Sequence, residues 1–280
     1  ELDRALADSS IGKRMTYDDM KAMKSSFVES REAVRLGEDK GKRYFTTMAQ
    51  MDLETDLKDY THYLAEDKSH SVKSEAMFQA LANKPTMSGE QRKALAHVSN
   101  PGSLKTVSGM AGSGKTFFMD AARETFEGSG YKVQGLALSG KAASGLQDET
   151  KIESRTLDSF FFALDKQRQE QGGGDPKKTG QSSQKNAFGI DRKTILMVDE
   201  AGMIDTRRMT RLFQEADDAG AKVILVGDAR QLQPVESGGA FQSVSKQVGT
   251  VELKEIRRQK EDWAKQAVHD FADGKADKGL

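Results

Sequence analysis

Short apolar runs and helical patterns alternate along the chain between residues 104 and 253. The runs contain few polar residues, which is typical of strands covered on both faces of a parallel sheet. Apolar residues at helical spacing follow some of the runs, as in 206–219, where Gly220 is expected to end the helix. The alternation predicts an α/β fold whose central, mostly parallel sheet is flanked by helices. The predicted strands are Leu104–Val107, Lys132–Leu138, Ile195–Val198, Val223–Val226 and Thr250–Leu253.

Residues 1–86 precede these runs and predict helices with polar breaks. The apolar residues within 17–36 form an imperfect helical stripe, and 72–81 predicts a short helix. Thr47 and Gln50 resemble a capping box at the start of a clearer helix. Its apolar face is formed by Leu53, Leu57, Tyr60 and Leu64. We therefore expect a helical N-terminal segment before the sheet.

The stretch from Gly109 to Thr116 matches the phosphate-binding pattern G-x-x-x-x-G-K-[ST] at every fixed position. It lies between a predicted strand and a predicted helix, where backbone N–H groups and the helix dipole bind phosphate. Lys115 is expected to reach the β- and γ-phosphates of ATP, and Thr116 to bind Mg²⁺. A plain glycine-rich turn is the alternative, and the complete match in context disfavours it. The predicted nucleotide-binding residues are Gly109, Gly112, Ser113, Gly114, Lys115 and Thr116.

Two acidic residues, Asp199 and Glu200, follow the buried run that ends at Val198. Ligands of open parallel sheets gather at the carboxyl ends of the strands, so both acids are expected beside the phosphate loop. Asp199 would then bind Mg²⁺, and Glu200 would polarise the attacking water. The alternative is that the pair only caps a helix. Gln231, in the turn after the next strand, is a candidate sensor of the γ-phosphate.

Composition narrows the possible functions. The 280 residues contain no cysteine, which excludes disulfides and thiolate metal sites, and the four scattered histidines do not suggest a metal cluster. Basic and acidic residues balance at 43 each, so nucleic acid would have to bind in a local groove. No apolar run approaches the ~18 residues of a membrane span, and no secretory signal opens the chain. We expect a cytoplasmic protein without a membrane segment.

The composition changes sharply in residues 166–189. Charged residues come first, and glycine, proline, lysine and serine follow without apolar periodicity. Such a stretch predicts a flexible insertion between two strands, at the rim of the sheet.

Together the motifs resemble superfamily 1 DNA helicases of the RecD-like, 5′-to-3′ branch, over roughly residues 72–275. The narrower likeness is to the TraA/TraI-type (MobF class) conjugative relaxase-helicases. This narrower likeness is based on the amino-acid sequences of Ile152–Thr156, Val198–Met203 and Glu255–Gln259. The resemblance implies a P-loop RecA-like motor domain that hydrolyses ATP with Mg²⁺ and acts on single-stranded DNA.

The resemblance also assigns roles to single residues. Gln91 matches the glutamine that recognises adenine in the family. The capping-box pattern by itself pairs Gln91 with Ser88 at the start of its own helix. Gln231 falls in the family's motif III, and Arg258 matches the arginine of motif IV, which makes it a candidate catalytic residue. The segments that contact DNA in the family correspond here to Ser139, Lys141, Arg155 and Thr156.

By the same resemblance, residues 87–256 form the first of two RecA-like domains, and residues 257–280 begin the second. The chain lacks an initiator Met and stops early in that second domain, so we expect a fragment whose partner is the rest of its own longer chain. Whether a relaxase domain lies upstream stays open, since no histidine cluster for DNA nicking is present here. Alone, the 280 residues are expected to bind nucleotide weakly, with little ATPase activity and no unwinding.

Other functions stay open beside a conjugative helicase. A stand-alone RecD-like repair helicase would carry the same motifs. A P-loop kinase is disfavoured by the segments at Gln231 and Arg258, for which a kinase has no need. An inactive nucleotide-binding docking module is disfavoured by the full set of catalytic residue types, Lys115, Thr116, Asp199, Glu200 and Gln231.

Overall fold

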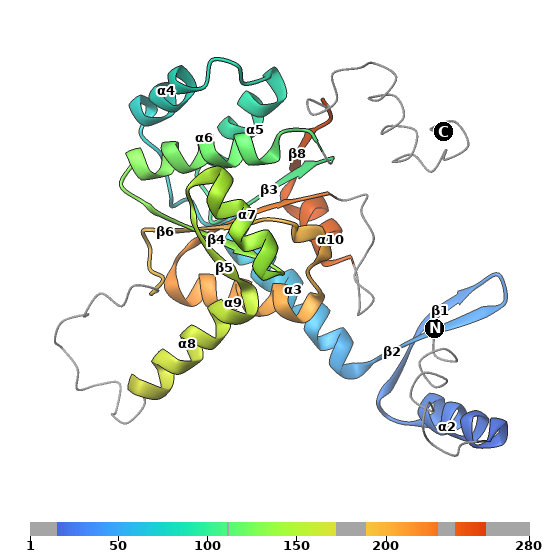
Figure 1. Ribbon diagram of the computed structural model, residues 1–280. Helices are drawn as coiled ribbons and strands as arrows, with labels where there is room; N and C mark the ends of the chain where they lie inside the picture. The colour runs from blue at the N-terminus through green and yellow to red at the C-terminus, as the bar shows by residue number, and fades with distance from the viewer. Residues whose placement is uncertain (1–15, 111, 172–188, 229–238, 256–280) are drawn as a thin grey trace. The chain divides into compact units, whose positions relative to one another are not determined.

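The computed structural model divides into two compact units, residues 1–56 and 57–280 (Figure 1). The structure describes residues 16–110, 112–171, 189–228 and 239–255. Helix α3 (Met48–Glu66) contains the limit between the two units. The start of α3 confirms one of the two bonds of the predicted capping box, because Thr47 Oγ1 accepts a hydrogen bond from the Gln50 N–H at 3.1 Å, whereas the Gln50 side-chain amide donates to Glu54 at 2.8 Å.

The first unit contains helix α2 (Tyr17–Glu29) and an antiparallel hairpin of strands β1 (Ala33–Asp39) and β2 (Lys42–Thr47). The helical stripe predicted over residues 17–36 is therefore wrong from residue 33 onward, where β1 begins, and neither strand was predicted. Its helical part is confirmed, since Thr16 and Asp19 form a capping box at the start of α2.

The reason for the hairpin is visible in its turn and its strands. Lys40 and Gly41 have φ angles of 48° and 76°, the left-handed conformation that a two-residue hairpin turn requires at both central positions. Leu36, which we assigned to a helical stripe, is exposed and lies where the register of β1 shifts between Arg35 and Gly37. In the hairpin Val34 pairs with Thr46, a cross-strand contact that is not visible from either segment alone.

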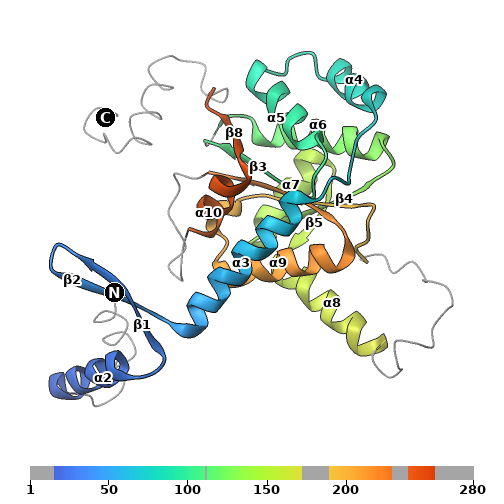
Figure 2. The same ribbon diagram turned by 180° about the vertical axis from the view of Figure 1, so that it is seen from behind.

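The second unit is built on a six-stranded sheet with the order β5-β4-β6-β7-β3-β8 (Figures 1 and 2). All neighbouring strands in this sheet pair in parallel, which confirms the predicted α/β class. The strands are β3 (Leu104–Gly109), β4 (Lys132–Ala137), β5 (Glu153–Thr156), β6 (Thr194–Val198), β7 (Lys222–Gly227) and β8 (Thr250–Leu253). Among these strands, β5 was not predicted.

Helices cover both faces of this sheet. One face packs against α4 (Ser74–Asn83), α5 (Gly89–Ser99), α6 (Lys115–Gly128) and α7 (Gly140–Thr150). The other face packs against α3 from Leu57 onward, α8 (Leu157–Gln171), α9 (Thr206–Ala219) and α10 (Ala240–Val248). A short 3₁₀ helix, η1 (Ala201–Met203), follows β6.

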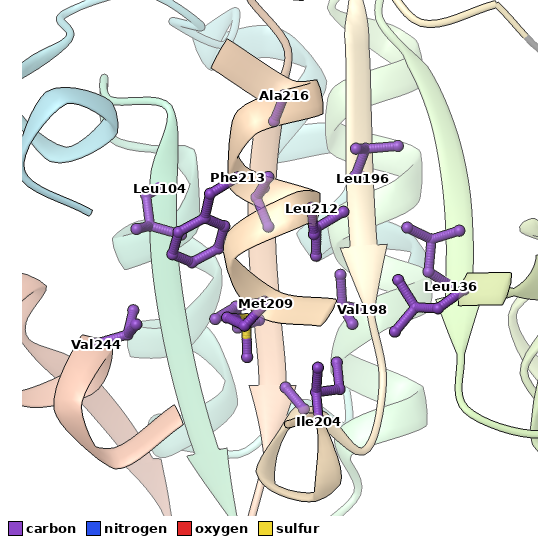
Figure 3. Close-up of a cluster of buried hydrophobic side chains, with 14 of the residues drawn as sticks. Leu104, Leu136, Leu196, Val198, Ile204, Met209, Leu212, Phe213, Ala216 and Val244 are labelled. Atoms are coloured by element: carbon purple, nitrogen blue, oxygen red, sulfur yellow. The ribbon is translucent and has the colours of Figure 1, made fainter. Parts of the chain in front are cut away.

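The alternation of side chains along β6 shows how the two cores form. Ile195 and Met197 point into the core beneath α5 and α6, whereas Leu196 and Val198 point into the core beneath α9. Figure 3 shows this second core, in which Leu196 and Val198 lie beside Leu212 of α9. Because both faces are buried, residues 195–198 of the strand are all apolar, as the sequence indicated.

Two predictions about helix ends have opposite outcomes. Helix α9 ends at Gly220 in the left-handed conformation (φ 63°), as predicted. Helix α8 instead continues to Gln171, so residues 166–171, predicted as part of an irregular insertion, are helical. Arg168 in this last turn donates two hydrogen bonds to Glu215 of α9, at 2.8 and 2.7 Å, and this tertiary contact holds the polar turn in place. Residues 172–188 lie outside the described part.

Helix α4 belongs to the second unit through its contacts with α6. Lys84, buried at the end of α4, donates hydrogen bonds to Asp120 at 2.6 Å and to Glu124 at 2.9 Å. The functional domain limits that we predicted at residues 86 and 256 stay predictions.

Candidate nucleotide-binding site

The glycine-rich loop connects β3 to α6, as the sequence predicted. Gly112 and Gly114 have φ angles of 79° and 78°, a conformation that only glycine adopts without strain, and Gly114 immediately precedes α6. The Ser113 hydroxyl is buried and donates to the Met110 carbonyl at 2.8 Å. The loop is therefore held in a curled form by its own hydrogen bonds. Ala111 lies outside the described residues.

Lys115 folds along the inside of this loop. Its Nζ donates to the Gly109 carbonyl at 2.7 Å and lies 3.4 Å from that of Met110. A Cβ on Gly109 would lie 2.8 Å from Ser113 Oγ and 3.0 Å from Lys115 Cγ, so only glycine fits beneath the lysine stem. The ammonium group is thus held against the loop by backbone carbonyls.

Gln91 makes both of the contacts that define the start of α5, and it also contacts the loop. Its Oε1 accepts from the Ser88 N–H at 3.0 Å and its own N–H donates to Ser88 Oγ at 3.2 Å, which confirms the predicted capping box. Its Nε2 donates to the carbonyls of Gly114 at 3.1 Å and Ser113 at 3.5 Å. The side chain is 1% exposed, so it acts as a buried tie between α5 and the loop. Its adenine-reading role stays a prediction.

The two acids lie where β6 ends, and β7 separates β6 from the strand that carries the loop. The Asp199 N–H donates to the Leu136 carbonyl at 2.9 Å, and Asp199 Oδ1 accepts from the Glu200 N–H at 2.8 Å. Glu200 has φ 53° and ψ 32°, a left-handed conformation that is uncommon outside glycine. Both side chains are partly buried.

The electrostatics connect these acids to the loop. Burial raises the pKa of the Asp199 carboxyl, and the charge of Glu149 raises it further. The N–H of Glu200 and the positive charge of Lys115 lower that pKa. The Lys115 charge therefore favours the ionised form of Asp199, and the assignment of both residues to one nucleotide site stays a prediction. Glu149, on α7, is a neighbour that our sequence analysis missed, because nothing in its local sequence marks it.

The oxygen donors fit Mg²⁺ held together with a nucleotide. Thr116 lies in the first turn of α6, and Mg²⁺ prefers hydroxyl, carboxylate, water and phosphate oxygens. In the described stretches, no three His, Cys, Asp or Glu side chains are grouped so that they could hold a metal by themselves. The roles of Thr116 and Asp199 as Mg²⁺ ligands stay predictions.

Two glycines bring the ends of β6 and β7 together. A Cβ on Gly202 would lie 2.7 Å from the Asp228 carbonyl oxygen, and a Cβ on Gly227 would lie 2.7 Å from the Gly202 nitrogen. The backbone of η1 thus packs directly on the end of β7. Our sequence analysis missed this contact, since each glycine by itself indicates only a turn. Gln231 and Arg258, the other predicted catalytic residues, lie outside the described stretches.

The predicted DNA-contacting residues lie at the ends of two neighbouring strands. Ser139 and Lys141 follow β4, Arg155 and Thr156 end β5, and Ala137 pairs with Thr156 in the sheet. Ser139 and Lys141 are exposed, whereas Arg155 and Thr156 are partly buried. Two of the four also have structural roles. Ser139 Oγ accepts from the Ala142 N–H at 3.1 Å, and Thr156 Oγ1 from the Ser159 N–H at 3.1 Å.

Arg155 lies in a partly desolvated position on this edge. Burial lowers the pKa of its guanidinium, and the charge of Glu153, at 3.7 Å, raises it. The structure thus gathers the four predicted residues on the carboxyl edge of the sheet, the same edge as the phosphate loop. A contact with DNA stays a prediction.

Comparison with known proteins identifies relatives for most of the chain. A family model described as "AAA domain" matches residues 86–280. "Probable conjugal transfer protein TraA" of Sinorhizobium fredii is 38% identical over 234 residues, which are 84% of this chain and 20% of that protein. "ATP-dependent RecD2 DNA helicase" of Deinococcus radiodurans is 30% identical over 156 residues, 56% of this chain and 20% of that one. The resemblance expected from the motifs is confirmed.

A solved structure is also similar, although weakly. It is the "complex structure of Arterivirus nonstructural protein 10 (helicase) with DNA", with a TM-score of 0.36 and 16% identity over 64% of this chain and 42% of that one. This likeness is too low to support an argument. Within the described residues, we find no helix that combines the length and the apolar character needed to cross a membrane.

Proposed function

Because the chain belongs to the AAA domain family, we propose that it binds ATP with Mg²⁺ and hydrolyses it as the motor part of a DNA helicase. One observation carries the proposal. The phosphate loop after β3 and the acids after β6 lie on one edge of the sheet, because β3, β7 and β6 are neighbouring parallel strands. This arrangement supplies a phosphate cradle, a cation ligand and a carboxylate base together.

Each residue has a chemical task in this proposal. The loop N–H groups and Lys115 bind the phosphates, and Thr116 and Asp199 hold Mg²⁺, which neutralises phosphate charge when it is bound. Glu200 orients the attacking water and accepts its proton. We further assign adenine recognition to Gln91, γ-phosphate sensing to Gln231, and stabilisation of the transferred phosphoryl group to Arg258.

The DNA-directed part of the proposal is supported by the relatives. This chain spans about 20% of the length of the relatives described above, so the activity of the whole protein is itself proposed. Higher identity over more of the chain favours conjugative DNA transfer over a stand-alone repair helicase. No observation favours a kinase or an inactive docking module.

We propose single-stranded DNA as the partner, bound along the carboxyl edge at Ser139, Lys141, Arg155 and Thr156. A second RecA-like domain from a longer chain would complete both the nucleotide cleft and the DNA track. Because the chain has equal numbers of basic and acidic residues, its overall charge does not attract DNA. DNA binding at this edge therefore depends on the side chains located there. We place the protein in the cytoplasm, where ATP and DNA are both available.

The proposal is tested first with the 280-residue chain, by titration with a fluorescent ATP analogue and Mg²⁺. Lys115→Ala should weaken binding, whereas Lys93→Ala, an exposed lysine on α5, should leave it unchanged. A chain extended to the length of the relatives is then assayed for ATP hydrolysis with and without single-stranded DNA. Stimulation by DNA supports a helicase. Equal binding by the two lysine variants would refute the nucleotide site, and turnover that responds only to a small acceptor would support a kinase.

A further inference from the structure

The first turn of α5 carries two adjacent residues that hold two different parts of the second unit. Gln91 donates to the phosphate-loop carbonyls, as described above. Its neighbour Glu90 accepts hydrogen bonds from the backbone N–H groups of Lys254 at 2.6 Å and Glu255 at 2.9 Å, both on Oε2. These two residues directly follow the last residue of β8.

A third contact connects the loop to the same strand end. The Met110 N–H donates to the Leu253 carbonyl at 3.3 Å, next to the pairing of Gly109 with Leu253 in the sheet. The loop is therefore bound at its start to the end of β8, and at its finish to Gln91 on α5. Glu90 connects α5 to the end of β8, so the three contacts form a continuous path around the loop.

Glu90 forms stronger hydrogen bonds than an acid in the first turn of a helix needs for its favourable interaction with the helix dipole. An acid in the first turn of a helix already interacts favourably with the helix dipole while it is exposed to water. Here the carboxylate is partly buried and accepts two backbone N–H groups from a segment 164 residues away in sequence. Charge-assisted hydrogen bonds of this kind are roughly twice as strong as neutral ones. Glu90 thereby fixes the backbone of Lys254 and Glu255 against the first turn of α5.

We propose that Glu90 is a positioning residue that couples the phosphate loop to the direction in which the chain leaves β8. The inference rests on the proposed function, because it requires nucleotide to bind at the loop. A ligand that contacts Gly114 or attracts the Gln91 amide changes the hydrogen bonds that hold the first turn of α5. The adjacent Glu90 carboxylate moves with that turn, and Lys254 and Glu255 follow it.

The test is amide hydrogen exchange of the 280-residue chain with and without a non-hydrolysable ATP analogue and Mg²⁺. In the parent, nucleotide should slow exchange in the phosphate loop and change exchange at residues 254 and 255 by at least about threefold. Glu90→Ala should speed exchange at 254 and 255 about tenfold or more without nucleotide, from the loss of two charge-assisted bonds, and should abolish the nucleotide response there. Glu90→Gln should restore most of the response, since an amide oxygen also accepts both bonds.

Glu252→Ala is the matched control. Glu252 forms a surface ion pair with the Lys254 ammonium at 2.8 Å on the same strand end, so this contact is with a side chain of the segment rather than with its backbone. It should keep the parental response. If nucleotide protects the loop but 254 and 255 do not respond, or if Glu90→Ala keeps the full response, the inference is overturned and the proposed function stands. No protection of the loop at all would overturn both.

Discussion

Replacement of Gly114 by alanine tests the tie between the phosphate loop and α5. Gly114 has φ 78° and ψ 34°, and a Cβ built on it would lie 2.4 Å from Gln91 Nε2. Gln91 is 1% exposed and holds both Ser88 and the loop, so it cannot yield without losing these contacts. The substitution therefore combines backbone strain with a steric clash.

The two costs have different sizes and can be separated. A left-handed conformation costs a residue with a Cβ about 1–2 kcal/mol. Expulsion of Gln91 loses its hydrogen bonds to Ser88 and Gly114 and leaves buried polar groups without partners, which costs about 1–3 kcal/mol. The sum is about 2–5 kcal/mol of unfolding free energy, a large fraction of the stability of a domain.

The assay is urea unfolding of Gly114→Ala, Gln91→Ala and the double variant. Gln91→Ala removes the side chain with which the new Cβ would clash. In this background, Gly114→Ala should cost only the backbone strain at position 114. We expect a coupling energy of about 1–3 kcal/mol between the two sites. Gly130→Ala is the control, since Gly130 has φ 92° with no atom within 4 Å of a built Cβ and should be additive with Gln91→Ala. Additivity within about 0.5 kcal/mol at Gly114 would refute the clash.

Three further predictions concern catalysis and pH. Glu200→Gln should keep nucleotide affinity but slow hydrolysis by ~10²-fold or more in a chain that hydrolyses ATP, because the amide cannot accept a proton; unchanged turnover would exclude Glu200 as the base. Lys115→Ala should weaken ATP affinity by at least about tenfold in a titration, through loss of a charge-assisted contact. Burial lowers the pKa of Lys222 to about 7 from 10.5. The unfolded chain thus binds more protons between these values, and the unfolding free energy should rise with pH there, by about 1.4 kcal/mol per pH unit at most. Lys222→Met should flatten this slope in urea titrations, while an unaltered slope would contradict the assignment.

The sequence alone was sufficient to predict those elements whose conformation depends on local sterics and burial. The apolar run of β6 predicted a strand buried on both faces, since only such a strand needs to be apolar at every position. The loop from Gly109 to Thr116 was predicted because its glycines adopt positive φ at Gly112 and Gly114 without help from the rest of the chain. The end of α9 at Gly220 follows from the same property.

Contacts between distant residues decided the rest. Residues 33–47 form a hairpin because two strands pair across a two-residue turn, and residues 166–171 are helical where Arg168 meets Glu215 of α9. The order of the strands, which puts the acids after β6 beside the loop after β3, also depends on packing of the whole sheet. A sequence pattern can specify a conformation through local sterics and burial, but it does not specify which partner satisfies a polar group. For this reason the motif glycines, Lys115, Asp199 and Glu200 could be predicted as site residues from sequence alone, whereas the contacts of Gln91 with the loop and of Glu90 with the end of β8 emerged only from the tertiary structure.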